Sequence, residues 1–143
     1  DFNYFRPGSQ AAMDAVFSAA YEKGEPVVGY YWEPTWLLGK YDMVLLEDEP
    51  YNPDTFKDGA TECPSVPVMI NCSNKFAEKQ PEFVEFLVKY KTSSALTSEA
   101  LAYMQETDAS YNETAKWFLR NHDELLDEWL SAEKAEAVRN SLL

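Results

Sequence analysis

Three short apolar runs constrain what this chain can fold into more than any other feature. They read PVVGYY at Pro26–Tyr31, DMVLL at Asp42–Leu46 and VPVMI at Val66–Ile70. Short runs rich in Val, Ile and Tyr, bounded by Pro, Gly or charged residues, are typical of buried strands. A short helix or turn from Pro34 to about Lys40 separates the first two runs, which is the pattern of βαβ construction. The sequence therefore predicts an α/β fold with few strands.

The predicted sheet is incomplete. Three strands are few for an α/β domain of 143 residues, because a compact doubly wound sheet usually has about five. The chain also begins at Asp1 without an initiator methionine. We interpret both features as signs of processing or of a piece of a longer protein. The missing strands are then expected from absent sequence or from another chain.

The rest of the sequence predicts helices, most of them after the third run. Ser9 is expected to be the N-cap of a first helix that Gly24 closes in the C′ position. Pro81 is expected at the first position of a later helix, and Ser110 with Glu113 forms a capping box. Residues 47–64 carry prolines, a glycine and acids without apolar periodicity, which indicates a crossing segment or hinge. Apolar residues at helical spacing also predict helices that begin at about Ser98, Leu125 and Ala132.

The charge of the chain narrows the choice of partner. There are 25 acidic and 12 basic residues, and the formal net charge is -13. Such a charge repels phosphate backbones and anionic lipid surfaces, so nucleic acid is not an expected partner. A cationic ligand is favoured. No apolar run approaches the roughly 18 residues that a membrane span requires.

The two cysteines and the single histidine predict neither a metal site nor a cofactor. The third run would separate Cys63 and Cys72 by roughly 13 Å, whereas a disulfide needs Cα atoms about 4.4–6.8 Å apart. Two small buried thiols are therefore the favoured interpretation, with an intrachain bridge as the alternative. His122 is expected at the surface, and no CxxC spacing accompanies it.

The segment GYYWEPTW, at residues 29–36, is the candidate ligand site. Its large rings, Tyr31, Trp32 and Trp36, have two interpretations. They could seal the edge of a core, which is the commoner fate of aromatic side chains. They could also hold a ligand, since ligands of open α/β sheets collect beyond the carboxyl ends of strands, and aromatic cages hold quaternary ammonium groups.

Polar residues near this segment also have two interpretations. Glu33 could add negative potential near a cation, although loop carboxylates are usually solvated. Gly8 and Ser9 could present backbone N–H groups to an anionic ligand group at a helix N-terminus, although a role of Ser9 as a cap alone is the favoured interpretation.

Four stretches together resemble one protein family. They are GSQAAMDAVFSAAYEKGEPVV, PVVGYYWEPTWLLGKYDMVLLEDEP, NKFAEKQPEFVEFLVKYK and ETAKWFLRNHDELLDEWL. In this order they resemble the later portion of the glycine betaine, proline betaine and choline substrate-binding proteins of ABC transporters, in which a strand ends in Trp-x-Pro-x-Trp. The resemblance covers nearly the whole chain.

The resemblance implies a fold and a function. The fold is the two-lobed, type II periplasmic-binding-protein fold, with residues 1–49 in one lobe, residues 50–65 as the hinge and residues 66–143, mainly helical, in the other. The function is extracytoplasmic capture of a quaternary ammonium compound for import by a membrane permease, without catalysis.

The resemblance also implies roles for residues. Trp32 maps to a cage wall that Tyr31 and Trp36 line or support. Many relatives have a histidine for the ligand carboxylate where this chain has Thr35, whose hydroxyl can donate one hydrogen bond but supplies no charge. This difference favours a ligand without a carboxylate, such as choline.

Three alternatives remain open at the level of sequence. A carbohydrate-active enzyme could use a pair of acids for catalysis and stack a sugar on the aromatic segment. The aromatic side chains could instead form a docking patch for another protein. Finally, the unfinished sheet edge permits a homodimer formed by segment exchange.

Overall fold

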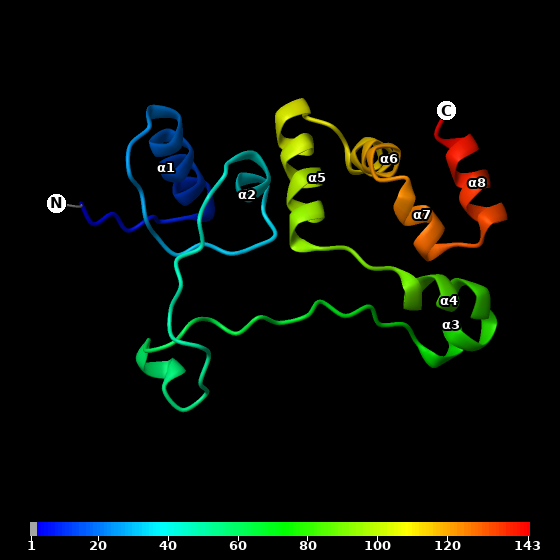
Figure 1. Ribbon diagram of the computed structural model, residues 1–143, viewed down its shortest axis with the longest axis horizontal. Coiled ribbons are helices and arrows are strands. Elements are labelled where there is room, and N and C mark those ends of the chain that lie inside the picture. The colour runs from blue at the N-terminus through cyan, green and yellow to red at the C-terminus, as the bar shows by residue number, and fades with distance from the viewer. Residues whose placement is uncertain (1–2) are drawn as a thin grey trace.

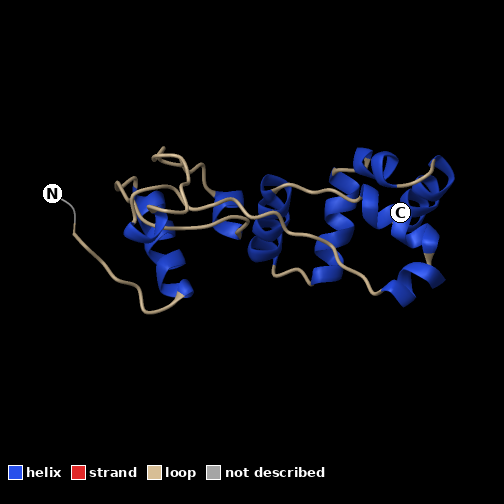
Figure 2. Cartoon of the chain, turned by 90° about the horizontal axis from the view of Figure 1, so that it is seen from below, coloured by secondary structure: helices blue, strands red, loops and turns tan. Residues whose placement is uncertain are grey.

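The computed structural model describes residues 3–143, and every regular element in that range is a helix (Figures 1 and 2). The prediction of an α/β fold is therefore wrong for the described residues. The helices are α1 (Gln10–Lys23), α2 (Trp36–Lys40), the 3-10 helix η1 (Phe56–Asp58), α3 (Asn74–Lys79), α4 (Pro81–Lys89), α5 (Ser94–Thr107), α6 (Tyr111–Asn121), α7 (Glu124–Trp129) and α8 (Ala132–Ser141).

The missing strands have a physical explanation in pairing. A strand persists in a sheet because its backbone groups pair with a neighbouring strand. Among the described residues, the three apolar runs make no backbone–backbone hydrogen bonds with one another. Apart from Met43, which packs against the cluster around Phe17, the apolar side chains of the second and third runs are exposed, with Leu45 92% and Val68 95% exposed. The sequence pattern located apolar segments correctly but carried no information about a partner strand.

The first run keeps the two-residue alternation of a strand while packing on a helix. Val27 and Tyr31 pack against the buried cluster around Phe17 of α1. Between them, a Cβ on Gly29 would lie only 3.1 Å from the Phe17 ring, so this position also faces α1. The alternate side chains are exposed: Val28, Tyr30 and Trp32. One face of the run is thus core and the other is open.

The predicted helix caps are confirmed. The Ser9 hydroxyl accepts a hydrogen bond from the Ala12 N–H at 3.2 Å, and Gly24 ends α1 with a φ of 68°. The Glu113 side chain accepts from the Ser110 N–H at 2.8 Å, while the Ser110 hydroxyl accepts from the Glu113 N–H, which completes the capping box. Local chemistry therefore fixes these ends without help from tertiary contacts.

A tight contact between α2 and α5 joins the first part of the chain to the later helices. In Figure 1, α5 stands between α1 and α2 on one side and α6, α7 and α8 on the other. Leu37 of α2 is completely buried. A Cβ on Gly39 would lie 2.1 Å from the Ser98 carbonyl oxygen, so only glycine permits this approach. The Thr35 N–H also donates to the Ser98 hydroxyl at 3.1 Å.

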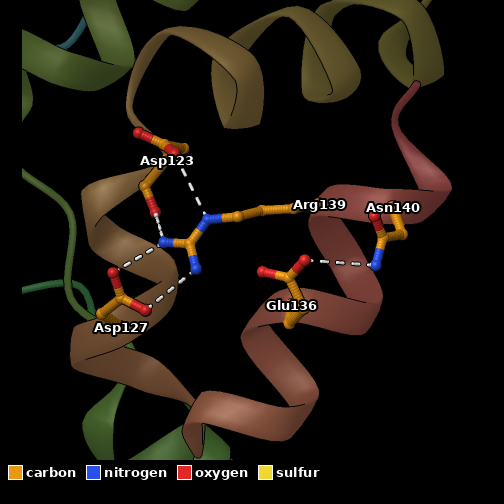
Figure 3. A network of polar contacts seen from close by, with 5 residues as sticks. All are labelled: Asp123, Asp127, Glu136, Arg139 and Asn140. Atoms are coloured by element: carbon orange, nitrogen blue, oxygen red, sulfur yellow. Dashed lines mark hydrogen bonds and ion pairs between the residues drawn. The ribbon is translucent and has the colours of Figure 1, made fainter.

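The last helices are held by a small core and by charged contacts. Trp129 of α7 and Ala135 of α8 are buried. Figure 3 shows Arg139 of α8 between Asp123 and Asp127, with its guanidinium nitrogens 3.1 and 2.6 Å from the two Asp127 carboxylate oxygens. This two-pronged pair pulls the Asp127 pKa below its ordinary value. The pair joins α8 to α7.

Both cysteines are free, as expected, but they are exposed and not buried. The reason is that the run between them is not a buried strand. In the described part of the chain, no group of His, Cys, Asp and Glu side chains has the arrangement of a metal site. No helix in that part is long and apolar enough to span a membrane.

Candidate functional site

The aromatic segment, residues 29–36, leads from the run packed on α1 into the first turn of α2. Thr35 is the N-cap of α2, with its hydroxyl accepting from the Leu38 N–H at 3.4 Å. The segment is thus held at both ends, by α1 on one side and by the α2–α5 contact on the other. A loop anchored in this way can present side chains in a fixed arrangement.

Trp32 is the most accessible of the predicted site tryptophans. Its side chain is 39% exposed. Its ring stacks on Tyr31, with centroids 5.0 Å apart and planes 21° from parallel, and lies 6.1 Å from the tilted ring of Tyr30. Aromatic rings therefore support the indole, and part of it stays open. An open indole supported by other rings can attract a cation through its face.

Tyr31 and Trp36 are tied to one carboxylate that the sequence interpretation missed. The Tyr31 hydroxyl donates to Asp14 Oδ1 at 2.6 Å, and the Trp36 indole N–H donates to Asp14 Oδ2 at 3.2 Å. Asp14 precedes the buried Phe17 by three residues, so both share one face of α1. A partly buried carboxylate needs hydrogen-bond donors, and here both come from the aromatic segment.

Burial and the hydrogen bond to Asp14 both favour the protonated form of Tyr31. Burial, followed by the hydrogen bond to Asp14, raises the pKa of Tyr31 to about 12, against a smaller lowering by Thr35. The phenol therefore keeps its proton at neutral pH and remains a donor to the carboxylate.

The other predicted site residues have different surroundings. Thr35 is buried, and its hydroxyl is occupied by the cap of α2. Glu33 is exposed beside Trp32 in the chain. Gly8 and Ser9 are exposed at the start of α1, where the Ser9 hydroxyl caps the helix. The structure thus gathers the aromatic side chains Tyr31, Trp32 and Trp36.

One carboxylate lies directly behind this segment. Asp14 is bound to Tyr31 and Trp36, whereas the other acid of α1, Glu22, accepts from the Tyr41 hydroxyl at 2.9 Å and is followed in the chain by Lys23. The nearby Lys40 of α2 is paired with Glu106 of α5 at 3.4 Å. The negative charge of Asp14 behind an aromatic surface favours a cationic ligand over an anionic one.

A hollow with a volume of about 990 Å³ lies elsewhere, among α4, α5, α6, α7 and α8. Its tryptophan, Trp129, is only 3% exposed and packs on Tyr90 at 4.6 Å. Of the two carboxylates that line it, Glu82 and Glu85, the first is paired with Lys134 at 2.9 Å. Because the tryptophan ring of this hollow is enclosed whereas Trp32 is partly open, we favour the aromatic segment as the site for a cation.

His122 contacts acidic side chains of two helices. Its Nε2 lies 3.1 Å from Glu99 Oε2 of α5, and its Nδ1 lies 3.7 Å from Glu124 Oε1 of α7. It is half-buried between these helices and not freely exposed at the surface. The residue therefore connects helices and lies outside the aromatic segment.

Comparison with known families gives one match. The sequence model described as the substrate binding domain of ABC-type glycine betaine transport system matches residues 1–121. The match includes the aromatic segment and extends to the end of α6. No solved structure matches the chain.

Proposed function

The chain belongs to the substrate-binding domains of ABC-type glycine betaine transport systems, and from this premise we propose that it captures a quaternary ammonium solute at an aromatic cage built around Trp32. Members of the family bind betaine-type solutes, work with an ABC permease and are not enzymes. They are extracytoplasmic or membrane-anchored.

The observation that carries the cage proposal is the partly open, ring-supported indole of Trp32. A methylated ammonium group has no N–H to donate, so it is recognised by aromatic faces and by negative potential. Tyr31 stacks on the indole of Trp32, and Tyr31 and Trp36 both donate to the Asp14 carboxylate. The exposed Glu33 adds negative charge at the edge.

Choline is the favoured ligand within the class, ahead of glycine betaine and proline betaine. The Thr35 side chain is buried, and its hydroxyl offers no charge for a ligand carboxylate. Backbone N–H groups at Gly8 and Ser9 are the remaining candidate partners for an anionic group, as expected at a helix N-terminus.

Closure of two lobes over the ligand is part of the proposal. The lobes are residues 1–49 and 66–143, with residues 50–65 as the hinge. Because α2 and α5 come from opposite sides of that hinge and pack together, lobe movement has to slide or break this contact. Closure would exclude water and strengthen the attraction between the cation and the rings.

A homodimer by segment exchange is a second part of the proposal. The exposed, unpaired apolar segments 42–46 and 66–70 support it, because such segments pair readily with another chain. Sedimentation equilibrium should then give a concentration-dependent dimer. A monomer at all concentrations would reject the exchange and leave the cage proposal untouched.

The test of the cage is calorimetric titration with choline, glycine betaine and glucose. Trp32→Ala should weaken choline binding by about 1–3 kcal/mol, since cation–π attraction and packing are both lost. Trp117→Ala is the matched control, because this indole stacks on Tyr103 at 4.1 Å, away from the segment. Equal affinities of the wild type and Trp32→Ala for choline would assign Trp32 to the surface and reject the cage.

A further inference from the structure

Asp14 connects α1 to both flanks of the aromatic segment. Each of its carboxylate oxygens accepts one hydrogen bond, Oδ1 from the Tyr31 hydroxyl at 2.6 Å and Oδ2 from the Trp36 indole N–H at 3.2 Å. The donors stand on either side of Trp32 in the sequence, and both contacts are partly buried. One side chain of α1 therefore fixes two rings of the segment at once.

We propose that Asp14 is the positioning residue of the quaternary ammonium site, holding Tyr31 and Trp36 so that Trp32 presents its indole to the ligand. This inference rests on the proposed function. The connection to Trp32 runs through the Tyr31 ring, whose hydroxyl is bound to Asp14 and whose face stacks on the indole at 5.0 Å. In this proposal Asp14 acts through Tyr31 and Trp36 and does not touch the ligand.

The two donors favour a carboxylate. In the structure, the phenol O–H and the indole N–H each donate to one oxygen of an anion, and such charge-assisted bonds are stronger than neutral ones. An asparagine of the same shape could still accept from the Trp36 N–H and donate to the Tyr31 oxygen, because a phenol also accepts, but both bonds would then be neutral. Asp14→Asn therefore removes the charge and weakens both contacts while changing the volume of the side chain very little.

The carboxylate also acts on the rings electrically. Hydrogen bonds in a partly buried network polarise one another, so a phenol and an indole that donate to an anion become richer in electrons. Their faces then attract a cation more strongly. Positioning and polarisation of the rings both increase the affinity for a cation, and Asp14→Asn weakens both effects.

The same helix offers a matched control. Glu22 of α1 accepts from the Tyr41 hydroxyl at 2.9 Å, and Tyr41 belongs to the same buried cluster as Phe17. Glu22→Gln therefore weakens a carboxylate–phenol bond between α1 and the core without touching the aromatic segment. A purely structural role for Asp14 predicts equal effects of the two variants on ligand affinity.

The experiment measures choline affinity by calorimetry and thermal stability for both variants of the full chain. Asp14→Asn should lower the affinity about tenfold, as expected for losing hydrogen bonds to a charged group, while Glu22→Gln leaves it unchanged. With Tyr31→Phe already present, Asp14→Asn should cost less than it does in the wild type. Equal affinities in Asp14→Asn and Glu22→Gln would overturn the proposal.

A second readout needs no ligand. In a proton–nitrogen NMR spectrum, Asp14→Asn should shift the indole N–H signals of both Trp36 and Trp32, while those of Trp117 and Trp129 stay in place. A shift of Trp36 alone would overturn the positioning of Trp32. Absence of choline and betaine binding by the wild type would reject the proposed function, and the NMR result would still decide the role of Asp14 in the segment.

Discussion

Replacing Gly39 by alanine tests the close approach of α2 and α5 that holds one end of the aromatic segment. The added Cβ would lie 2.1 Å from the Ser98 carbonyl oxygen and 2.4 Å from the carbonyl carbon, whereas ordinary contact begins at 3.4 Å. The two helices must therefore separate by roughly 1.3 Å, the difference between 3.4 and 2.1 Å. The obstacle is backbone, so no side-chain rotation can relieve it.

The expected cost of Gly39→Ala lies at the upper end of the range for overpacking, about 2–3 kcal/mol in the free energy of unfolding. Separation of the helices would also stretch the hydrogen bond from the Thr35 N–H to the Ser98 hydroxyl, which is 3.1 Å long. Because Thr35 ends the aromatic segment, choline affinity should fall together with stability.

The assay is urea unfolding followed by circular dichroism, with Gly8→Ala as the matched control. A Cβ on Gly8 would meet nothing within 4 Å, so this variant should be as stable as the wild type or slightly more stable. Ser98→Ala added to Gly39→Ala should give no rescue, since the clash is with the backbone carbonyl. A Gly39→Ala protein within about 0.5 kcal/mol of the wild type would refute the close contact.

Two further predictions concern the later helices, α4 to α8. The pKa values of Glu82 and Asp127 are lowered by hydrogen bonds from Lys134 and Arg139; their contribution to stability is therefore present above the ordinary values of 4.5 and 3.8 and is lost as the pH falls through the lower folded values. Arg139→Gln should remove the Asp127 part of this acid sensitivity in unfolding curves measured from pH 6 to pH 2, and an unchanged pH profile would contradict the pairing. Ser110→Ala should cost about 1 kcal/mol in urea unfolding because the capping box is lost, and a cost near zero would show that the cap is not formed in solution.

Helix ends could be predicted from the sequence because their determinants are local. Ser9, Gly24 and the Ser110–Glu113 pair act within one turn of the backbone, and the structure confirms each. The sheet prediction was wrong because a strand depends on a partner that no run of residues specifies by itself. The exposed Leu45 and Val68 show what a β-type segment looks like without that partner.

The candidate site was only partly visible in the sequence for a similar reason. The accumulation of rings in residues 29–36 is a composition signal, so Trp32 could be singled out at once. Asp14 was missed because its partners, Tyr31 and Trp36, lie 17 and 22 positions further along the chain. These contacts depend on how α1 packs against the segment. The packing follows from Val27, Gly29 and Tyr31, which all face Phe17.

The central claim is that the open indole of Trp32 recognises a permanent positive charge. Calorimetry with choline and its uncharged carbon isostere, 3,3-dimethyl-1-butanol, tests this claim most directly, because the two ligands share shape and hydroxyl and differ in charge. With about 0.5–2 kcal/mol of cation–π attraction from the one open ring, choline should bind about 2- to 30-fold more tightly. Equal affinities for the two ligands would contradict the claim and leave the segment as an apolar surface.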